Sequence, residues 1–315
     1  MHRIVFLDRA ILPIELRKPA FAHTWTEYPS TPDAEIVARL TGATIAISSK
    51  IPLRAATLEQ LPSLRFIAVA GAGVDAFDLD TCRAKGIPVS NVAGYAYQTV
   101  PEHTFMLILA LARNLPAYQR DVRARLWQQA QPFCHLGAPI FDLHGKTIGI
   151  IGEGAIGQGT ARIARGFGMH VLFADHEPPK APGIEYTPLD RLLEDSDVVA
   201  LHCPLTPATR GLIGVAQLAR MKPGALMINT ARGGLVDETA LLGALREGRI
   251  GGAALDVLSV EPPREGNPLL DADLPNLIVT PHVAWASREA MAAFAEQLIG
   301  NLEAFAAGAP RNRVA

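Results

Sequence analysis

The sequence predicts an α/β protein of two domains, each built around a parallel sheet. Short apolar runs alternate with helical patterns through most of the chain, and this alternation is typical of parallel strands joined by crossover helices. A length of 315 residues is enough for two cores of ordinary size. The rhythm changes at a long helical pattern, from residue 100 to about 127, which we expect to join the two domains.

The first hundred residues contain four candidate strands separated by helical patterns, at residues 3–8, 44–48, 64–70 and 88–91. In the long helix that follows, Phe105 and Leu109 fall on one face and Arg120 and Arg123 on a more exposed one. A looser stretch with two prolines and a glycine, 128–144, separates this helix from the second series of strands.

The second series predicts a doubly wound sheet, because six strands alternate with helical segments. The strands are expected at residues 147–151, 170–174, 198–202, 225–229, 252–256 and 277–280. The alanine-rich segment 287–307 has apolar residues at helical spacing and is predicted to be a packing helix.

Composition favours small-molecule chemistry in a reducing compartment. The net charge is -2, from 29 basic and 31 acidic residues mixed along the chain, so neither nucleic acid nor an anionic membrane is an expected partner. Cys82, Cys134 and Cys203 lack metal-ligand or redox-pair spacing, which predicts reduced thiols of a cytoplasmic protein and no metal site. We find no export signal, and the longest apolar run is far shorter than the roughly 20 residues of a membrane span.

The stretch TIGIIGEGAIG, residues 147–157, has the spacing of a dinucleotide-binding turn. Gly152 permits the turn after a strand, Gly154 lets the backbone approach a pyrophosphate, and Gly157 lets helix and strand pack closely. Ala155 and Ile156 open a helix predicted over residues 155–167, whose free N–H groups and dipole favour an anion. The alternative is a purely structural turn between strand and helix.

Asp175 favours NAD over NADP as the dinucleotide. It ends the next predicted strand, 18 residues after Gly157, where a carboxylate accepts hydrogen bonds from both ribose hydroxyls and repels a phosphate. The neighbouring His176 weakens this preference, because a cationic imidazole tolerates a phosphate.

Three polar residues follow the later strands: Arg232, Glu261 and His282. In an open α/β sheet, ligands sit beyond the carboxyl ends of the strands, so these side chains are expected to face one cleft. An arginine anchors a carboxylate through two parallel hydrogen bonds. A histidine held in one tautomer by a glutamate donates a proton to a developing alkoxide. Each residue alone is more often structural, but together they suit hydride transfer to a 2-oxo acid.

Six blocks of the sequence resemble the D-isomer-specific 2-hydroxyacid dehydrogenases, along essentially the whole chain. They are GAGVD (71–75), PEHTF (101–105), GKTIGIIG (145–152), LHCPLTPATR (201–210), MKPGALMINTARGGLVD (221–237) and TPHVAW (280–285). Residues 259–263, SVEPP, and 282–287, HVAWAS, are most similar to the glycerate dehydrogenase, or hydroxypyruvate reductase, branch.

The resemblance implies a Rossmann NAD domain at 100–285 and a split, flavodoxin-like substrate domain at 1–99 and 286–315. It implies that His282 is the general acid-base, with Glu261 as its partner and Arg232 on the substrate carboxylate and carbonyl. Backbone N–H groups of Ala72 and Gly73 would bind the carboxylate. The residues implied along the cofactor are Gly152, Gly154, Ala155, Ile156, Gly157, Asp175, Cys203, Thr209, Thr230, Ala231, Asp256 and His282.

The implied activity is hydride transfer between NAD(H) and a short D-2-hydroxy acid, with hydroxypyruvate and D-glycerate or glyoxylate and glycolate as the pairs. Relatives pair through their NAD domains, so a homodimer is expected. Formate dehydrogenase has glutamine where Glu261 stands, which disfavours it. Phosphoglycerate dehydrogenase and a non-catalytic NAD(H)-sensing protein remain alternatives.

Overall fold

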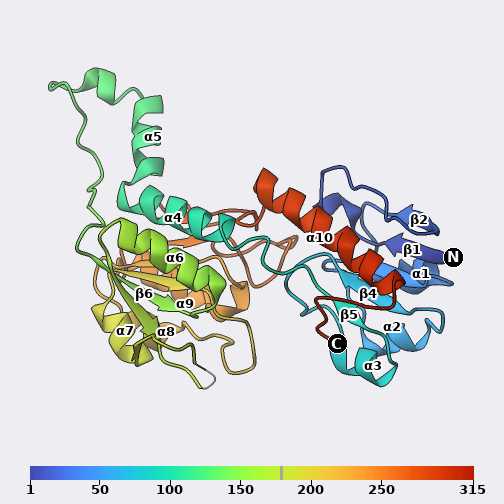
Figure 1. Cartoon of the computed structure of the whole chain (residues 1–315). Helices are drawn as coiled ribbons and strands as arrows, with labels where there is room; N and C mark the ends of the chain where they lie inside the picture. The colour runs from blue at the N-terminus through green and yellow to red at the C-terminus, as the bar shows by residue number, and fades with distance from the viewer. Residues whose placement is uncertain (178–179) are drawn as a thin grey trace. The chain divides into compact units, whose positions relative to one another are not determined.

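The computed structural model describes residues 1–177 and 180–315 and divides into two compact units (Figure 1). Met1–Ala96 and Ala286–Ala315 form the first unit, and Tyr97–Trp285 form the second. Within the described ranges, no helix is both long and apolar enough to cross a membrane.

The first unit contains a five-stranded parallel sheet in the order β2-β1-β3-β4-β5. This order is that of flavodoxin-like folds. The strands β3 and β4 are buried along their whole length, as expected for strands covered on both faces. The bounds are β1 His2–Phe6, β2 His23–Glu27, β3 Ile45–Ser48, β4 Phe66–Val69 and β5 Val89–Ser90.

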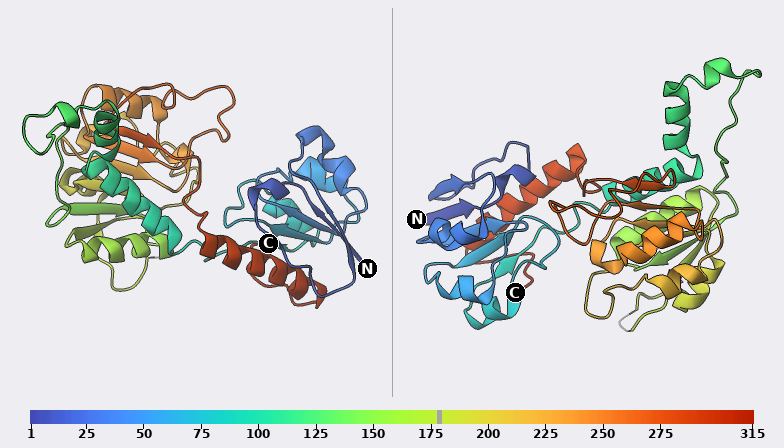
Figure 2. Two further views of the ribbon diagram at one scale, coloured as in Figure 1. Left: turned by 90° about the horizontal axis from the view of Figure 1, so that it is seen from above. Right: turned by 180° about the vertical axis from the view of Figure 1, so that it is seen from behind.

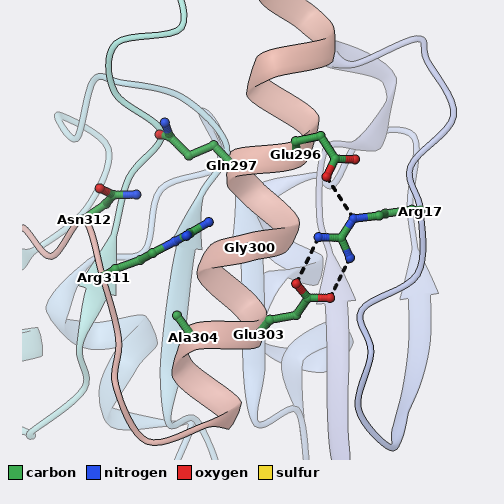
Figure 3. A pocket seen from close by; sticks show the side chains of 8 residues that line it. All are labelled: Arg17, Glu296, Gln297, Gly300, Glu303, Ala304, Arg311 and Asn312. Carbon is green, nitrogen blue, oxygen red and sulfur yellow. Dashed lines mark hydrogen bonds and ion pairs between the residues drawn. The ribbon is translucent and has the colours of Figure 1, made fainter.

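The end of the chain completes the first unit. Helix α10, Arg288–Ala306, begins after Ser287, whose hydroxyl accepts a hydrogen bond from the Ala290 N–H at 3.1 Å. Arg17 joins this helix through Glu296, at 2.9 Å, and through a two-fold contact with Glu303 (Figure 3). The last residues then pair with β5. The short helices of this unit are α1 Ile36–Leu40, α2 Ala55–Glu59 and α3 Leu79–Ala84.

The second unit contains a seven-stranded parallel sheet in the order β12-β11-β10-β9-β6-β7-β8. From β8 to β11 this is the Rossmann order, extended by β12, so the predicted fold class is confirmed. The bounds are β6 Thr147–Ile151, β7 His170–Ala174, β8 Tyr186–Thr187, β9 Val198–Leu201, β10 Leu226–Asn229, β11 Gly252–Leu255 and β12 Leu277–Val279.

Helices cover both faces of this second sheet (Figure 2). Helices α4, Thr99–Ala112, and α6, Ala155–Gly166, pack on one face around Phe105, Ile108 and Ala161. On the other face, Leu192, Leu218 and Leu241 pack from three further helices. These are α7 Leu189–Asp195, α8 Val215–Arg220 and α9 Glu238–Arg246.

The single long helix expected from residue 100 to about 127 is wrong. Helix α4 ends at Ala112, and α5, Leu115–Arg123, begins after Asn114, which adopts a left-handed conformation with φ 47°. Pro116 explains the break, because it has no N–H to donate to the Ala112 carbonyl. The Phe141 N–H makes that hydrogen bond instead, at 3.0 Å.

Candidate active site

Two glycines of the turn after β6 are required by the protein's own packing. Gly152 has φ 108°, and a Cβ there would lie 2.6 Å from the backbone N of Cys203. A Cβ at Gly157 would lie 1.9 Å from the Gly152 carbonyl oxygen. Both distances are shorter than any tolerated contact, so these glycines let α6 start tightly against the sheet.

Gly154 is different, because nothing in the described part of the chain requires a glycine there. It precedes α6 with φ −59°, and a Cβ would meet no heavy atom within 4 Å. The open space lies at the first turn of α6, where Ala155 and Ile156 have backbone N–H groups without helical acceptors. A pyrophosphate that approaches the backbone fits this cradle, since it needs both the missing side chain and the free donors.

The carboxylate of Asp175 follows β7 and lies in a corner of mixed charge. It accepts a hydrogen bond from the His176 N–H at 2.8 Å and pairs with Lys180, whose hydrogen bond holds the pKa of Asp175 below its usual range. His176 also contacts Glu153 of the glycine turn, with 2.9 Å between Nε2 and Oε2. Neither Glu153 nor Lys180 was predicted from the sequence. A charged residue inside a glycine turn is the signal that could have identified Glu153.

The loop after β9 packs against the glycine turn. Cys203 reaches Gly152 with its backbone, and burial raises the pKa of its thiol to about 11. His202 contacts Thr160 of α6, with 2.9 Å between Nε2 and Oγ1, and burial lowers its pKa to about 4. The Thr209 hydroxyl donates to the Pro204 carbonyl at 2.7 Å, so it holds the shape of its own loop.

The three predicted polar residues lie on loops after neighbouring strands. Strands β10, β11 and β12 are adjacent and parallel, and Arg232, Glu261 and His282 follow them in that order. Asn229, the last residue of β10, is fully buried and holds the Arg232 loop: its side-chain amide donates to the Arg232 carbonyl at 2.9 Å. The Ala231 N–H donates to the Asn229 side chain at 3.0 Å. The sheet therefore puts all three loops along one edge.

His282 and Glu261 form a hydrogen-bonded pair. Their Nδ1 and Oε2 atoms are 2.7 Å apart, and the other carboxylate oxygen accepts the Leu258 N–H at 2.9 Å. A carboxylate accepts only, so Nδ1 carries the hydrogen. The side chains of His282 and Glu261 are 30% and 27% exposed, so the pair lies partly open to solvent.

Asp256 holds the loop that carries His282. It is 1% exposed and accepts three hydrogen bonds: from the Thr280 hydroxyl at 2.5 Å, the Val283 N–H at 2.9 Å and the Ala284 N–H at 2.8 Å. His282 sits between these donors with φ 57°, a left-handed conformation that a histidine rarely adopts. The place of Asp256 along the cofactor stays a prediction.

The remaining predicted residues belong to other segments of the chain. Thr230 follows β10, and its hydroxyl lies 3.0 Å from that of Thr104 on α4. Ala72 and Gly73 belong to the first unit, in the segment after β4, where the Asn91 side chain donates to the Ala72 carbonyl at 2.8 Å. In the parts of the chain that the structure describes, no three His, Cys, Asp or Glu side chains gather as a metal site.

Comparison with known proteins decides the family. Residues 105–284 match the D-isomer specific 2-hydroxyacid dehydrogenases, NAD binding domain. The chain is also 51% identical over 313 residues to a glycerate dehydrogenase of Methylorubrum extorquens, covering 99% of this chain and 98% of that protein. The chain belongs to the D-isomer specific 2-hydroxyacid dehydrogenase family. This dehydrogenase is therefore a nicotinamide-dependent oxidoreductase.

Solved structures agree with the assignment. A protein from Thermus thermophilus superposes on this dehydrogenase with a TM-score of 0.85 and 35% identity, over 99% of this chain and 100% of that one. An NADPH-dependent glyoxylate/hydroxypyruvate reductase from Sinorhizobium meliloti gives a TM-score of 0.84 at 28% identity, over 100% and 98%.

Proposed function

We propose that this dehydrogenase reduces a short 2-oxo acid, hydroxypyruvate or glyoxylate, to the D-2-hydroxy acid with NADH. The observation that carries the proposal is the 2.7 Å pair of His282 and Glu261 on a loop held in a left-handed conformation. Residues held in sparsely populated backbone conformations cluster at active sites. The substrates named for relatives support the choice of acid: glycerate, hydroxypyruvate and glyoxylate.

In the proposed mechanism, the protein's residues bind the acid and move one proton. A bound nicotinamide supplies the hydride to C2. The guanidinium of Arg232 binds the carboxylate and polarises the carbonyl. His282 donates its Nε2 proton to the carbonyl oxygen as the C2–H bond forms, and Glu261 stabilises the imidazolium before this transfer. The neutral histidine then takes a new proton from solvent.

In the first unit, Ala72 and Gly73 are the proposed donors of backbone N–H groups to the substrate carboxylate. The support is their match to the GAGVD block and the hydrogen bond that fixes the Ala72 carbonyl. Proline at position 72 removes one donor. We expect it to raise KM for the acid and to leave the dissociation constant of NADH unchanged.

The test of the reaction is NADH oxidation by the purified protein against hydroxypyruvate, glyoxylate, pyruvate and phosphohydroxypyruvate. Turnover of hydroxypyruvate or glyoxylate supports the proposal, and faster turnover of phosphohydroxypyruvate would favour the phosphoglycerate alternative. His282→Ala should reduce kcat by about 10²- to 10⁴-fold while NADH still binds. NADH binding without turnover of any acid would favour the sensing protein.

The proposed preference for NAD rests on Asp175, whose carboxylate suits two ribose hydroxyls and repels a phosphate. Lys180 opposes it, because its ammonium group pairs with the same carboxylate. The ring of His176 lies against Glu153 instead. Asp175→Ala should weaken NADH binding and strengthen NADPH binding, measured as two dissociation constants by fluorescence titration. A wild-type protein that binds NADPH more tightly would contradict the preference.

We also propose that this dehydrogenase is a homodimer that pairs through its second unit. Helix α5 and the following segment stand away from the sheet of that unit (Figure 1) and expose large apolar side chains. An apolar groove of about 590 Å³ lies at α4, where Met106, Leu115 and Ile163 line it. A second copy supplies matching surface for both features. The exposed residues are Leu115, Val122, Leu126, Trp127, Phe133, Leu136 and Ile140.

Light scattering after gel filtration tests this pairing. The double substitution of Phe133 and Leu136 by serine should give a monomer, because these side chains are 91% and 86% exposed and contribute little to the fold of one chain. Val215→Ser is the matched control, since that side chain is 72% exposed on α8. A dimer that survives the double substitution contradicts the proposed surface.

We propose that this dehydrogenase is located in the cytoplasm. The three cysteines are all free thiols, which is typical of proteins in a reducing compartment. Fractionation of the source cells, with this chain detected by antibody, tests it. Recovery outside the cytoplasm would contradict it.

A further inference from the structure

Helix α4 contacts the loop that carries His282 through two residues one turn apart. The Thr99 hydroxyl donates to the Ala284 carbonyl at 3.2 Å. His103 lies 3.1 Å from Thr280, measured from Nε2 to Oγ1, and its side chain is 15% exposed. Residues four apart share a face of a helix, so one face of α4 supports both ends of this loop.

The hydrogens of this contact have one consistent arrangement. Asp256 carries no hydrogen when ionised, so the Thr280 hydroxyl must donate to it across their 2.5 Å contact. That hydroxyl is then left with acceptor capacity only. His103 must therefore donate from Nε2, which fixes its tautomer. The result is a directed series of hydrogen bonds from His103 to Thr280 and on to Asp256.

This series ends at the backbone on the C-terminal side of His282. Asp256 accepts the N–H groups of Val283 and Ala284 and so holds His282 at φ 57°. A carboxylate already oriented by Thr280 presents fixed acceptors to those two N–H groups. The orientation of the proposed acid then depends on a donor from a different element, helix α4.

We propose that His103 is a positioning residue that orients His282 through Thr280 and Asp256. The inference rests on the proposed role of His282 as the proton donor. Neither the glycine motif nor the strand-end residues pointed to His103, which the sequence shows only as part of the PEHTF block.

The protonation state of His103 agrees with this role. Burial lowers its pKa, and the carboxylate of Asp256, 3.6 Å from Nε2, opposes that shift. The ring is therefore neutral near pH 7, with its one hydrogen on Nε2. Because the bond to Thr280 uses this hydrogen, the arrangement needs no proton exchange during turnover.

The experiment compares two substitutions in the full-length protein. His103→Leu removes the donor, and we expect kcat to fall about tenfold or more, as for a misplaced catalytic group. His103→Gln keeps an N–H donor at similar reach and should recover most of kcat. KM for the acid and the dissociation constant of NADH should stay within about twofold in both variants, because neither Arg232 nor the glycine turn is touched.

A double-mutant cycle separates this role from loss of stability. Thr280→Val removes the hydroxyl, so adding His103→Leu should cause little further loss of kcat. Ser196→Ala is the matched control: it removes a buried hydrogen bond, 2.6 Å to the Leu192 carbonyl, elsewhere in the same unit. It should lower the melting temperature without lowering kcat. Additive effects of the two substitutions would overturn the proposal.

A spectroscopic readout is independent of activity. In a ¹⁵N-labelled protein, the two-bond ¹H–¹⁵N correlation spectrum of the imidazole rings should contain a signal of the Nε2–H tautomer that is assigned to His103 because it is absent from His103→Gln. A Nδ1–H tautomer for His103 would overturn the proposal. His282→Ala is measured alongside: if it retains full kcat, the proposed function fails, whereas a large loss with full activity in His103→Leu refutes only the present inference.

Discussion

The same substitution at two glycines three residues apart is expected to separate folding from cofactor binding. At Gly157 an added Cβ would lie 1.9 Å from the Gly152 carbonyl oxygen, so alanine forces the backbone apart. Overpacking of this kind costs about 1–3 kcal/mol. For a unit of this size each kcal/mol lowers the melting temperature by about 2–4 °C. Gly157→Ala should therefore melt roughly 2–12 °C lower than the wild type.

At Gly154 the added Cβ meets nothing within 4 Å at an ordinary φ, so alanine should leave the melting temperature of the ligand-free protein unchanged or slightly raised. If the pyrophosphate uses this space, the same overpacking applies to the complex, and about 1–3 kcal/mol corresponds to a roughly 5- to 150-fold weaker NADH affinity. Scanning fluorimetry and NADH titration measure the two effects. A Gly154→Ala protein that binds NADH as tightly as wild type would refute the assignment of the cradle.

Three further predictions concern pH and thiol chemistry. Arg17 holds the pKa of Glu303 at about 2, below its ordinary 4.5, so its stabilisation is present above pH 4.5 and lost as the pH falls toward 2. In urea unfolding near pH 7, the free energy of unfolding of Glu303→Gln should be about 1 kcal/mol below that of the wild type, a small loss because the ion pair is partly exposed. In strong acid the two proteins should have the same free energy of unfolding. His202 is neutral when folded, with a pKa of about 4, so stability should decline from pH 6.5 to 4, and a His202→Gln protein should decline less. The raised pKa of Cys203 leaves about one thiolate in a thousand near pH 8; a disulfide reagent should therefore label Cys134 first, and rapid labelling of a Cys134→Ser protein would contradict this.

The sequence predicts most strands because their burial leaves a clear signal. Residues 148–151 and 198–201 are buried throughout, and the strands that contain them are predicted within one residue of their observed bounds. Strand β2, His23–Glu27, was not predicted, because it lies at the edge of its sheet and its sequence is mostly polar and aromatic, without a buried apolar run. The break at Pro116 was missed because apolar spacing continues across it, although a proline inside a helical pattern was a sufficient warning.

Fewer of the polar side chains at the candidate site can be predicted from the sequence. Strand-end reasoning selected Arg232, Glu261 and His282, because parallel strands carry their ligands at one edge. It had no means of selecting His103 or Glu153, whose partners lie 177 and 23 residues away along the chain. Such pairs depend on how helix α4 and the glycine turn pack, which only the folded coordinates define. Family resemblance supplied the roles of the first three residues but not these contacts.

The return of the chain to its first unit has a consequence for synthesis on the ribosome. Helix α10 and the last residues supply contacts to Arg17, to Ala93 and to strand β5, yet they are translated after the whole of Tyr97–Trp285. At about 5–20 residues per second, that intervening unit takes roughly 10–40 s to make. During this interval the nascent first unit exposes the apolar surface that α10 later covers, so the second unit should acquire protease resistance first, and a ribosome stalled before Arg288 should carry an N-terminal segment that chaperones still recognise.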